Sequence, residues 1–255
     1  MLKKKLMLNF VLLLCISYAR CNNTMEPYVI GGDFTDISHF PHSVFLNIDC
    51  VTTYICGSSI LNQKILLTAA HCINDCKRRW QIEGYAGHEN LSKVKVMRTI
   101  KKILKHEKYN DQSMANDIAL LYLERSLPLG KYIQRVTIRR WHSPNEIASV
   151  AGWGIVNRVT NKDTIHLKRA LQKLISPRVC ASFGGMFTGM MCAKSPEKNT
   201  SPASGDSGSA LITKDMQQIG LVSYIFSEYP NMPIYTNVSH YYNWINTKSR
   251  SLHCS

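Results

Sequence analysis

Three short segments of the sequence contain residue types that could form a nucleophilic catalytic site. They are Thr68-Ala69-Ala70-His71-Cys72, Asn116-Asp117-Ile118-Ala119-Leu120-Leu121 and Gly205-Asp206-Ser207-Gly208-Ser209. A serine hydroxyl is a poor nucleophile at neutral pH and needs a nearby base. Histidine suits that role because its ordinary pKa lies near neutrality, and a buried carboxylate can fix the imidazole tautomer. The segments therefore offer Ser207 as a nucleophile, His71 as its base and Asp117 as the partner of His71.

The glycines around Ser207 suit a site that stabilises a developing negative charge. Gly205 lets a backbone amide face a substrate where a side chain could block it, so the amides of Gly205 and Ser207 could bind an oxyanion. Each candidate also has a structural interpretation, with His71 as a buried histidine, Asp117 as a turn former and Ser207 as a loop serine. For one residue alone the structural interpretation is favoured, whereas the three together favour catalysis.

Short apolar runs predict the strands that would position these residues. The runs are separated by Gly, Pro, Asn and Ser, a spacing typical of antiparallel sandwiches and barrels. We expect strands over Ser43–Ile48, Ser58–Leu61, Ile65–Thr68, Ile118–Leu123, Leu171–Ile175, Ser209–Thr213 and Gln218–Ile225. Apolar residues at helical spacing predict a terminal helix within Val238–Lys248. The chain has 255 residues, of which 45% are hydrophobic, enough for a sizeable core in one large or two small domains.

The N-terminal residues match a secretory signal peptide. Three lysines at positions 3–5 precede an apolar run over Leu6–Ile16, and Ser17-Tyr18-Ala19 supplies the small residues of a cleavage site. The run is shorter than the ~20 residues that a membrane-spanning helix needs. We therefore expect a signal peptide over residues 1–19 and a secreted, extracellular protein without a membrane span.

The cysteines and glycosylation motifs fit the same compartment. Of nine cysteines, Cys15 would leave with the signal peptide, and the remaining eight could form four disulfides in an oxidising environment. Zinc binding is the alternative, but the cysteines are scattered and no CxxC pair occurs. Four sequons make the protein a candidate glycoprotein, at Asn22, Asn90, Asn199 and Asn237.

The chain is strongly basic, with a formal charge of +14. Residues 1–28 carry four Lys or Arg and one Glu, so the charge from Val29 onward is +11. Seven Lys or Arg residues lie within Lys93–Lys108. This stretch is either a solvated strand face and loop, which we favour, or a contact for anionic glycans or membrane surfaces. Nucleic acid is not an expected partner, because no binding motif accompanies the secretory signal.

The order of the motifs resembles the chymotrypsin-like (trypsin-fold) serine proteases over roughly Val29 to Lys248. Five further segments match that family, namely Val29-Ile30-Gly31-Gly32, Cys56-Gly57-Ser58-Ser59-Ile60-Leu61, Ala151-Gly152-Trp153-Gly154, Val222-Ser223-Tyr224 and Pro233-Ile234-Tyr235-Thr236-Asn237-Val238. The resemblance implies an all-β protease domain over 29–255, with two six-stranded antiparallel β-barrels and a C-terminal helix. It places the first barrel at about 42–130, the second at about 131–237 and the helix at about 238–248.

The same resemblance implies a serine endopeptidase that hydrolyses peptide bonds through an acyl-enzyme. Ser207 would attack the scissile carbonyl, His71 would take and return its proton, and Asp117 would orient His71. The amides of Gly205 and Ser207 would hold the oxyanion, and the Ser223 hydroxyl would support Asp117. The site would lie between the barrels, with Ser207 contributed by the second barrel.

The resemblance further implies a zymogen with a propeptide over residues 20–28. Cleavage between Tyr28 and Val29 would let the new Val29 amine pair with Asp206, and only that pairing would order the oxyanion site. Family members are usually cut after Arg or Lys. Tyr28 therefore predicts an activating protease that selects aromatic residues. The competing outcome is a mature chain that begins at Arg20 with an unformed site.

Disulfide pairing is only partly implied by the family. The matching pairs are Cys56–Cys72 and Cys180–Cys192, and the candidate pairs are Cys50–Cys76 and Cys21–Cys254. Cys50 and Cys76 lie in loops that should be neighbours around the histidine motif. The alternative for Cys21 or Cys254 is a bond to another chain.

The segments that would build the substrate pocket depart from the family pattern. Ala203 replaces a usual cysteine, whose partner in the loop after Tyr224 is also missing. The resemblance puts Ser201 at the pocket base and Ile225 and Pro233 on its walls. Ser201 lacks the charge that selects Lys or Arg, and the bulky walls shorten the pocket. We therefore expect cleavage after small or medium apolar residues.

No metal or cofactor is expected. The family's calcium loop would follow Gly87, where Lys93, Lys95 and Arg98 oppose cation binding. We expect a monomer whose partners are protein or peptide substrates, an activating protease and protein inhibitors. The alternative is a catalytically silent homologue that acts as a binding protein or cofactor, which the pocket and Tyr28 favour and the intact motifs disfavour. A lectin-like glycan-binding protein would leave the three motifs unexplained.

Overall fold

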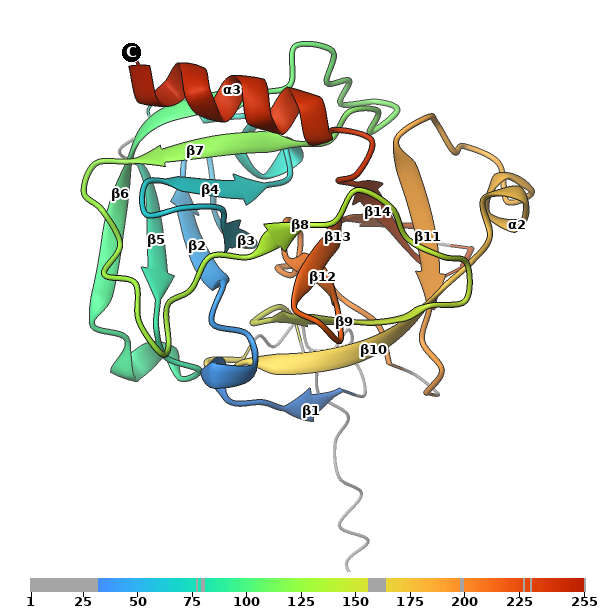
Figure 1. Cartoon of the computed structure of the whole chain (residues 1–255), viewed down its shortest axis with the longest axis horizontal. Coiled ribbons are helices and arrows are strands. Elements are labelled where there is room, and N and C mark those ends of the chain that lie inside the picture. Colours follow the sequence, from blue (N-terminus) through green and yellow to red (C-terminus); the bar gives the residue numbers. More distant parts are fainter. Residues whose placement is uncertain are drawn as a thin grey trace, which may run out of the picture.

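The computed structural model describes residues 32–76, 78, 81–155, 164–197, 200–226, 228–229 and 231–254. Two closed six-stranded antiparallel barrels lie side by side, and the terminal helix α3 packs across the first (Figure 1). The all-β fold that the sequence predicted is therefore confirmed. The predicted signal peptide and propeptide, with Tyr28 and Val29 at the predicted cleavage site, lie outside the described residues.

The first barrel has the strand order β2-β3-β4-β7-β6-β5. Its strands are β2 Ser43–Asp49, β3 Thr53–Ile60, β4 Ile65–Thr68, β5 Ile82–Ala86, β6 Val96–Lys105 and β7 Ala119–Leu123. Along β2, Val44, Leu46 and Ile48 are buried and alternate with partly exposed residues. This period of two directs every second side chain into the barrel.

The second barrel closes because β9 pairs with both β10 and β12. Its strands are β9 Ile147–Gly152, β10 Lys168–Leu174, β11 Met190–Lys194, β12 Ala210–Thr213, β13 Gln217–Ile225 and β14 Pro233–Asn237. Two short strands join its outside, β1 Asp33–Phe34 on β10 and β8 Thr137–Ile138 on β13. The short helical segments are η1 Ile37–His39, η2 His71–Ile73, η4 Leu91–Lys93 and α2 Pro177–Ala181.

The terminal helix lies further along the chain than the predicted Val238–Lys248. Helix α3 spans Tyr242–Cys254. The Asn237 side chain accepts hydrogen bonds from the backbone N–H and the hydroxyl of Ser239, which forms a turn where the helix was expected to begin. The helix continues past Lys248 because Leu252, seven residues after Ile245, packs in the same apolar cluster. No helix in the described part of the chain is long and apolar enough to span a membrane.

Three disulfides connect neighbouring segments. They join Cys50 to Cys76, Cys56 to Cys72 and Cys180 to Cys192. Two of them enclose η2, so the loop that begins with His71 is attached covalently to β3 and to the turn after β2. The predicted pair Cys21–Cys254 stays a prediction, because Cys21 lies outside the described residues.

Candidate active site

His71 and Asp117 form a hydrogen-bonded pair on the first barrel. His71 opens η2 directly after β4, and Asp117 precedes β7. The His71 Nδ1 atom lies 2.8 Å from Asp117 Oδ2, and the His71 backbone N–H donates to Asp117 Oδ1 at 2.9 Å. These two contacts fix both the position and the ring orientation of His71. The proton on Nδ1 leaves Nε2 free to act as a base.

Asp117 is almost fully buried, with 1% of its surface exposed. A buried carboxylate is costly unless donors satisfy it. The Ser223 hydroxyl supplies one, donating to Asp117 Oδ2 at 2.5 Å, and the Thr236 hydroxyl donates to the Asp117 backbone oxygen at 2.7 Å. Both donors belong to the second barrel. The sequence suggested the Ser223 contact but missed Thr236, which has no local signal because it lies 119 positions from Asp117.

Ser223 reaches Asp117 because β13 contains an irregularity at this residue. The pairing of β13 with β14 shifts between Val222 and Tyr224. A β-bulge of this kind redirects one side chain out of the regular alternation. Asn116, the residue before Asp117, has a positive φ of 58°. The Tyr241 hydroxyl donates to the Asn116 side-chain oxygen at 3.1 Å.

Ser207 lies on a tight turn that glycines make possible. Gly208 has a φ of 80°, and a Cβ there would lie 2.3 Å from Thr68 Oγ1 and 2.4 Å from the Gly57 oxygen. The backbone N–H of Gly57 donates to the Ser207 oxygen at 2.7 Å. The turn therefore fits against β3 and β4 of the first barrel, which places Ser207 beside the segment that carries His71.

Gly205 and Ser207 leave two backbone N–H groups without an acceptor among the described residues. Gly205 has a φ of 92°, and a Cβ there would lie 2.8 Å from Ile55 Cδ1 and 2.9 Å from Gly154 Cα. The residue must therefore be glycine for this turn to form. Unpaired N–H donors beside a nucleophile can stabilise an oxyanion.

Asp206 is turned away from solvent, with 2% of its surface exposed. The backbone N–H groups of Gly154 and Ala203 each donate to its carboxylate at 2.9 Å. Burial raises the pKa of Asp206 to about 6, although these donors lower it. Gly152 and Gly154 make room for the carboxylate, because a Cβ at these positions would lie 2.2 and 2.7 Å from Asp206 Oδ1.

The hydroxyl of Ser207 makes no hydrogen bond with His71 within the described part of the chain. His71 Nε2 instead lies 3.8 Å from Cys72 Sγ. Catalytic hydrogen bonds are often long before a substrate binds. Cys56, His71 and Cys72 have potential metal-ligand atoms close together. Both sulfur atoms belong to one disulfide, however, so this group lacks the thiolates that a metal site needs.

The three predicted pocket residues come from the segment before the Ser207 turn and from β13 and β14. Ser201 is completely buried, and its hydroxyl donates to the Pro202 oxygen at 3.1 Å. Ile225 and Pro233 are paired across β13 and β14, with Pro233 buried and Ile225 partly exposed. None of these three residues has a charged side chain.

The remaining predicted sites are distributed over the molecule. Asn90 caps η4, and its side-chain nitrogen lies 3.0 Å from His166 Nε2. Asn237 accepts the two bonds from Ser239 described above. Asn22 and Asn199 lie outside the described residues. The basic stretch Lys93–Lys108 includes all of β6.

A family model described as Trypsin matches residues 29–245. A chymotrypsin of Phaedon cochleariae is 32% identical over 231 residues, which cover 87% of this chain and 82% of that protein. Trypsin alpha of Drosophila erecta is 28% identical, covering 89% of this chain and 90% of the relative. Transmembrane protease serine 11C of Mus musculus is 30% identical, covering 87% of this chain and 53% of the relative.

Two solved structures share the fold. The scabies mite inactivated protease paralogue S-D1 superposes with a TM-score of 0.78 and 23% identity, covering 85% of this chain and 95% of that one. HL collagenase gives a TM-score of 0.77 and 24% identity, covering 86% and 98% of the two chains. At these identities the likeness concerns the arrangement of the two barrels.

Proposed function

Because the chain belongs to the trypsin family of serine endopeptidases, we propose that it hydrolyses peptide bonds through an acyl-enzyme formed on Ser207. One observation carries this proposal. Asp117 accepts hydrogen bonds from His71 on its own barrel and from Ser223 on the other, and the nearby N–H groups of Gly205 and Ser207 have no acceptor among the described residues. This arrangement supports a base, an orienting acid and an oxyanion site at one place.

In the proposed reaction, His71 Nε2 takes the proton from the Ser207 hydroxyl as that oxygen attacks the scissile carbonyl carbon. Asp117 stabilises the imidazolium that forms. The N–H groups of Gly205 and Ser207 stabilise the negative oxygen of the tetrahedral intermediate. His71 then gives the proton to the leaving amine, and a water molecule activated by His71 hydrolyses the acyl-enzyme.

We further propose that cleavage at Tyr28–Val29 activates the enzyme. The Val29 amine would pair with the Asp206 carboxylate. Asp206 is suited to this because it is buried, lies next to Ser207 and has no cationic partner among the described residues. An ammonium group brought beside it would stabilise its charged form. The protein would be secreted after removal of residues 1–19.

Cleavage after small or medium apolar residues is the proposed specificity. The support is the buried, uncharged Ser201 and the Ile225–Pro233 pair, which leave no carboxylate to bind a substrate Lys or Arg. A peptide library profile of the activated protein tests this. Preferred cleavage after Lys or Arg would contradict it.

Labelling with a fluorophosphonate probe tests the catalytic proposal itself. The protein cleaved at Tyr28–Val29 should react, and the Ser207→Ala variant should not. The uncleaved chain should react far more slowly, since in this proposal the Val29 amine is needed to hold the oxyanion site. If the cleaved, folded protein shows no Ser207-dependent labelling, the chain is a catalytically silent homologue that acts through binding.

A further inference from the structure

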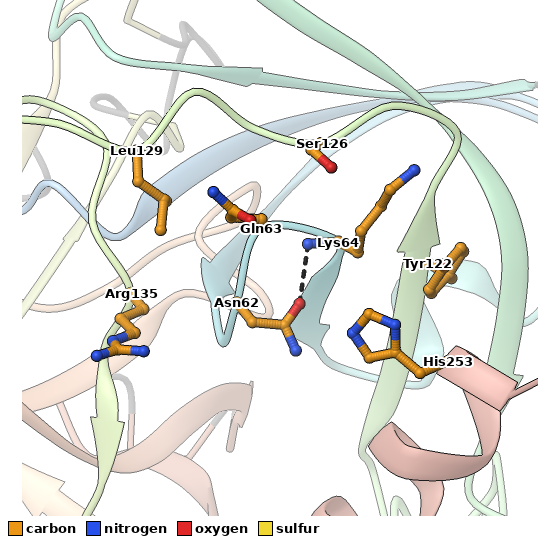
Figure 2. A pocket seen from close by; sticks show the side chains of 8 residues that line it. All are labelled: Asn62, Gln63, Lys64, Tyr122, Ser126, Leu129, Arg135 and His253. Atoms are coloured by element: carbon orange, nitrogen blue, oxygen red, sulfur yellow. Dashed lines mark hydrogen bonds between the residues drawn. The ribbon is translucent and has the colours of Figure 1, made fainter.

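A basic cleft lies on the first barrel beside the end of α3 and shares no residue with the candidate active site (Figure 2). Its volume is about 630 Å³, within the usual range of small-ligand sites. The residues that matter for its chemistry are Asn62, Gln63, Lys64, Tyr122, Arg135 and His253. They come from the turn between β3 and β4, from β7, from the connection between the barrels and from α3.

The charge of the basic cleft is positive and not neutralised internally. Lys64 and Arg135 line it, and neither takes part in the five ion pairs found among the described residues. The Lys64 ammonium instead donates to the backbone oxygen of Glu124 at 2.8 Å. Cations gathered in a concave surface concentrate the positive potential and attract anions.

Strand β6 extends this positive charge to the wall of the cleft. The ammonium groups of Lys64 and Lys102 lie 5.6 and 5.5 Å from the centre of the Tyr122 ring. Arg98 donates to the backbone oxygen of Ser126, a lining residue, at 2.9 Å. Lys102 and Arg98 both belong to the basic stretch Lys93–Lys108. Part of that stretch therefore converges on the cleft instead of forming a uniform solvated face.

The turn between β3 and β4 adds neutral hydrogen-bond donors. Asn62 Oδ1 accepts from the backbone N–H of Lys64 at 2.8 Å, which fixes the amide orientation and leaves its nitrogen to meet a ligand. Figure 2 shows Asn62 between Arg135 and His253, with Gln63 and Lys64 beside it. A ligand with many acceptor oxygens would match this set of donors.

We propose that the basic cleft binds a sulfated oligosaccharide segment of an anionic glycan. Sulfate groups would pair with Lys64 and Arg135, and sugar oxygens would accept from the amide nitrogens of Asn62 and Gln63. An acidic peptide matches less well, because peptide recognition relies on apolar anchors and the Tyr122 ring is already flanked by two ammonium groups. Such binding would hold the protein on extracellular polysaccharide and leave Ser207 accessible.

Calorimetric titration of the full chain with a heparin-derived octasaccharide, at an ionic strength of about 0.15 M, tests the proposal. The Lys64→Gln/Arg135→Gln double variant should bind roughly tenfold more weakly or worse, because it loses two charge-assisted contacts. The matched control is Lys93→Gln/Lys95→Gln, which removes the same charge from exposed residues outside the cleft. The control should change affinity by less than about threefold. Equal losses in both double variants would mean diffuse attraction and would overturn the site.

A second variant, Asn62→Asp, keeps an acceptor for the Lys64 N–H and places a carboxylate in the cleft. It should weaken octasaccharide binding while its thermal midpoint stays near that of the parent. If the double variant does not fold, Asn62→Asp becomes the test of octasaccharide binding to the cleft. Unchanged affinity of Asn62→Asp would then overturn the proposal. The desulfated octasaccharide and a poly-glutamate peptide are the comparison ligands. Either one binding as tightly as the sulfated form would also contradict a sulfated glycan site.

Discussion

The carboxylate of Asp117 accepts three hydrogen bonds, two from His71 and one from Ser223. The donors have different tasks. In the proposed reaction, the His71 contacts would set the geometry of the base, and the Ser223 hydroxyl would stabilise the negative charge without taking part in proton transfer. The Thr236 hydroxyl acts on the backbone oxygen of the same residue, where no charge develops. Substitutions at the two hydroxyls should therefore have separable effects.

We expect Ser223→Ala to lower kcat/KM by roughly 10- to 100-fold, since a hydrogen bond to a charged group contributes about 1.5–3 kcal/mol. Thr236→Val is the matched control and should lower the free energy of unfolding by about 1 kcal/mol with a smaller effect on kcat/KM. Steady-state kinetics and chemical unfolding of both variants provide the measurement. A larger kinetic loss in Thr236→Val than in Ser223→Ala would contradict this assignment.

Asp206 gives the uncleaved chain a characteristic pH dependence. Burial raises its pKa from 3.8 to about 6, so its contribution to stability is full below the unfolded pKa and is lost as pH rises through the folded pKa. The Asp206→Asn variant should therefore gain stability relative to the parent by roughly 3 kcal/mol between about pH 3.5 and pH 7.5. The asparagine amide lacks one of the two acceptor oxygens of the carboxylate, and this loss changes the stability of the variant by the same amount at every pH. The quantity to measure is therefore the change in the stability difference with pH.

Chemical unfolding of both chains in the Ser207→Ala background, which cannot cleave itself, provides these values. Cleavage at Tyr28–Val29 should reverse the trend, because a paired amine favours the charged carboxylate. A stability difference that is the same at both pH values would show that Asp206 titrates normally.

At the scale of elements, the turn that carries Ser207 depends on a backbone conformation that only glycine adopts easily. In Gly205→Ala, the new Cβ would meet Ile55 and Gly154 at a φ of 92°. We expect fluorophosphonate labelling of Ser207 to slow by about 100-fold or more, as expected when an oxyanion donor is displaced. Gly130→Ala is the control, because a Cβ there has nothing within 4 Å. Labelling of Gly205→Ala at the parental rate would exclude this role for the turn.

How much the sequence predicts depends on the kind of element. The strands next to His71 and Ser207 have continuous buried apolar runs, and β4 Ile65–Thr68 has the predicted limits. The terminal helix begins later than predicted because the hydrogen bonds from Ser239 to the Asn237 side chain favour a turn over a helix at this point. The spacing of apolar residues does not reveal such hydrogen bonds. The contact between Ser223 and Asp117 was implied only by the family resemblance, and the bulge that permits it was not predicted because it arises from pairing with β14.

The basic cleft and the Thr236 contact were beyond prediction for a related reason. Lys64, Tyr122, Arg135 and His253 come from distant parts of the chain, and each alone has the appearance of an ordinary surface residue. The sequence showed that Lys93–Lys108 is basic, but not which of its side chains turn towards the β3–β4 turn. Only the closed barrel brings these groups to one place.

At the scale of the whole molecule, the two barrels meet through buried polar contacts as well as apolar packing. The Ser59 hydroxyl on β3 donates to Gln218 Oε1 on β13 at 2.8 Å, and both residues are fully buried. Gln218 Nε2 in turn donates to the Gly220 oxygen at 3.1 Å. A buried donor that loses its partner incurs the full desolvation cost, so a single substitution at this contact should destabilise the protein.

Gln218→Leu should therefore lower the free energy of unfolding by roughly 1–3 kcal/mol. Adding Ser59→Ala should restore part of the loss, because the unpaired hydroxyl is then removed. A double-mutant cycle measured by chemical unfolding would report a coupling of about 1 kcal/mol. Strictly additive effects would mean that the contact does not link the barrels energetically.

Asp117 is contributed by one barrel and is stabilised by Ser223 and Thr236 of the other. The two halves are consequently not interchangeable modules. A chimera with the first barrel of this chain and the second barrel of a relative contains Asp117. The hydroxyls that hydrogen-bond to Asp117 must then come from the relative's barrel. Recombination between family members should therefore keep parental activity and stability only where the incoming β13 and β14 carry hydroxyl residues at these two positions.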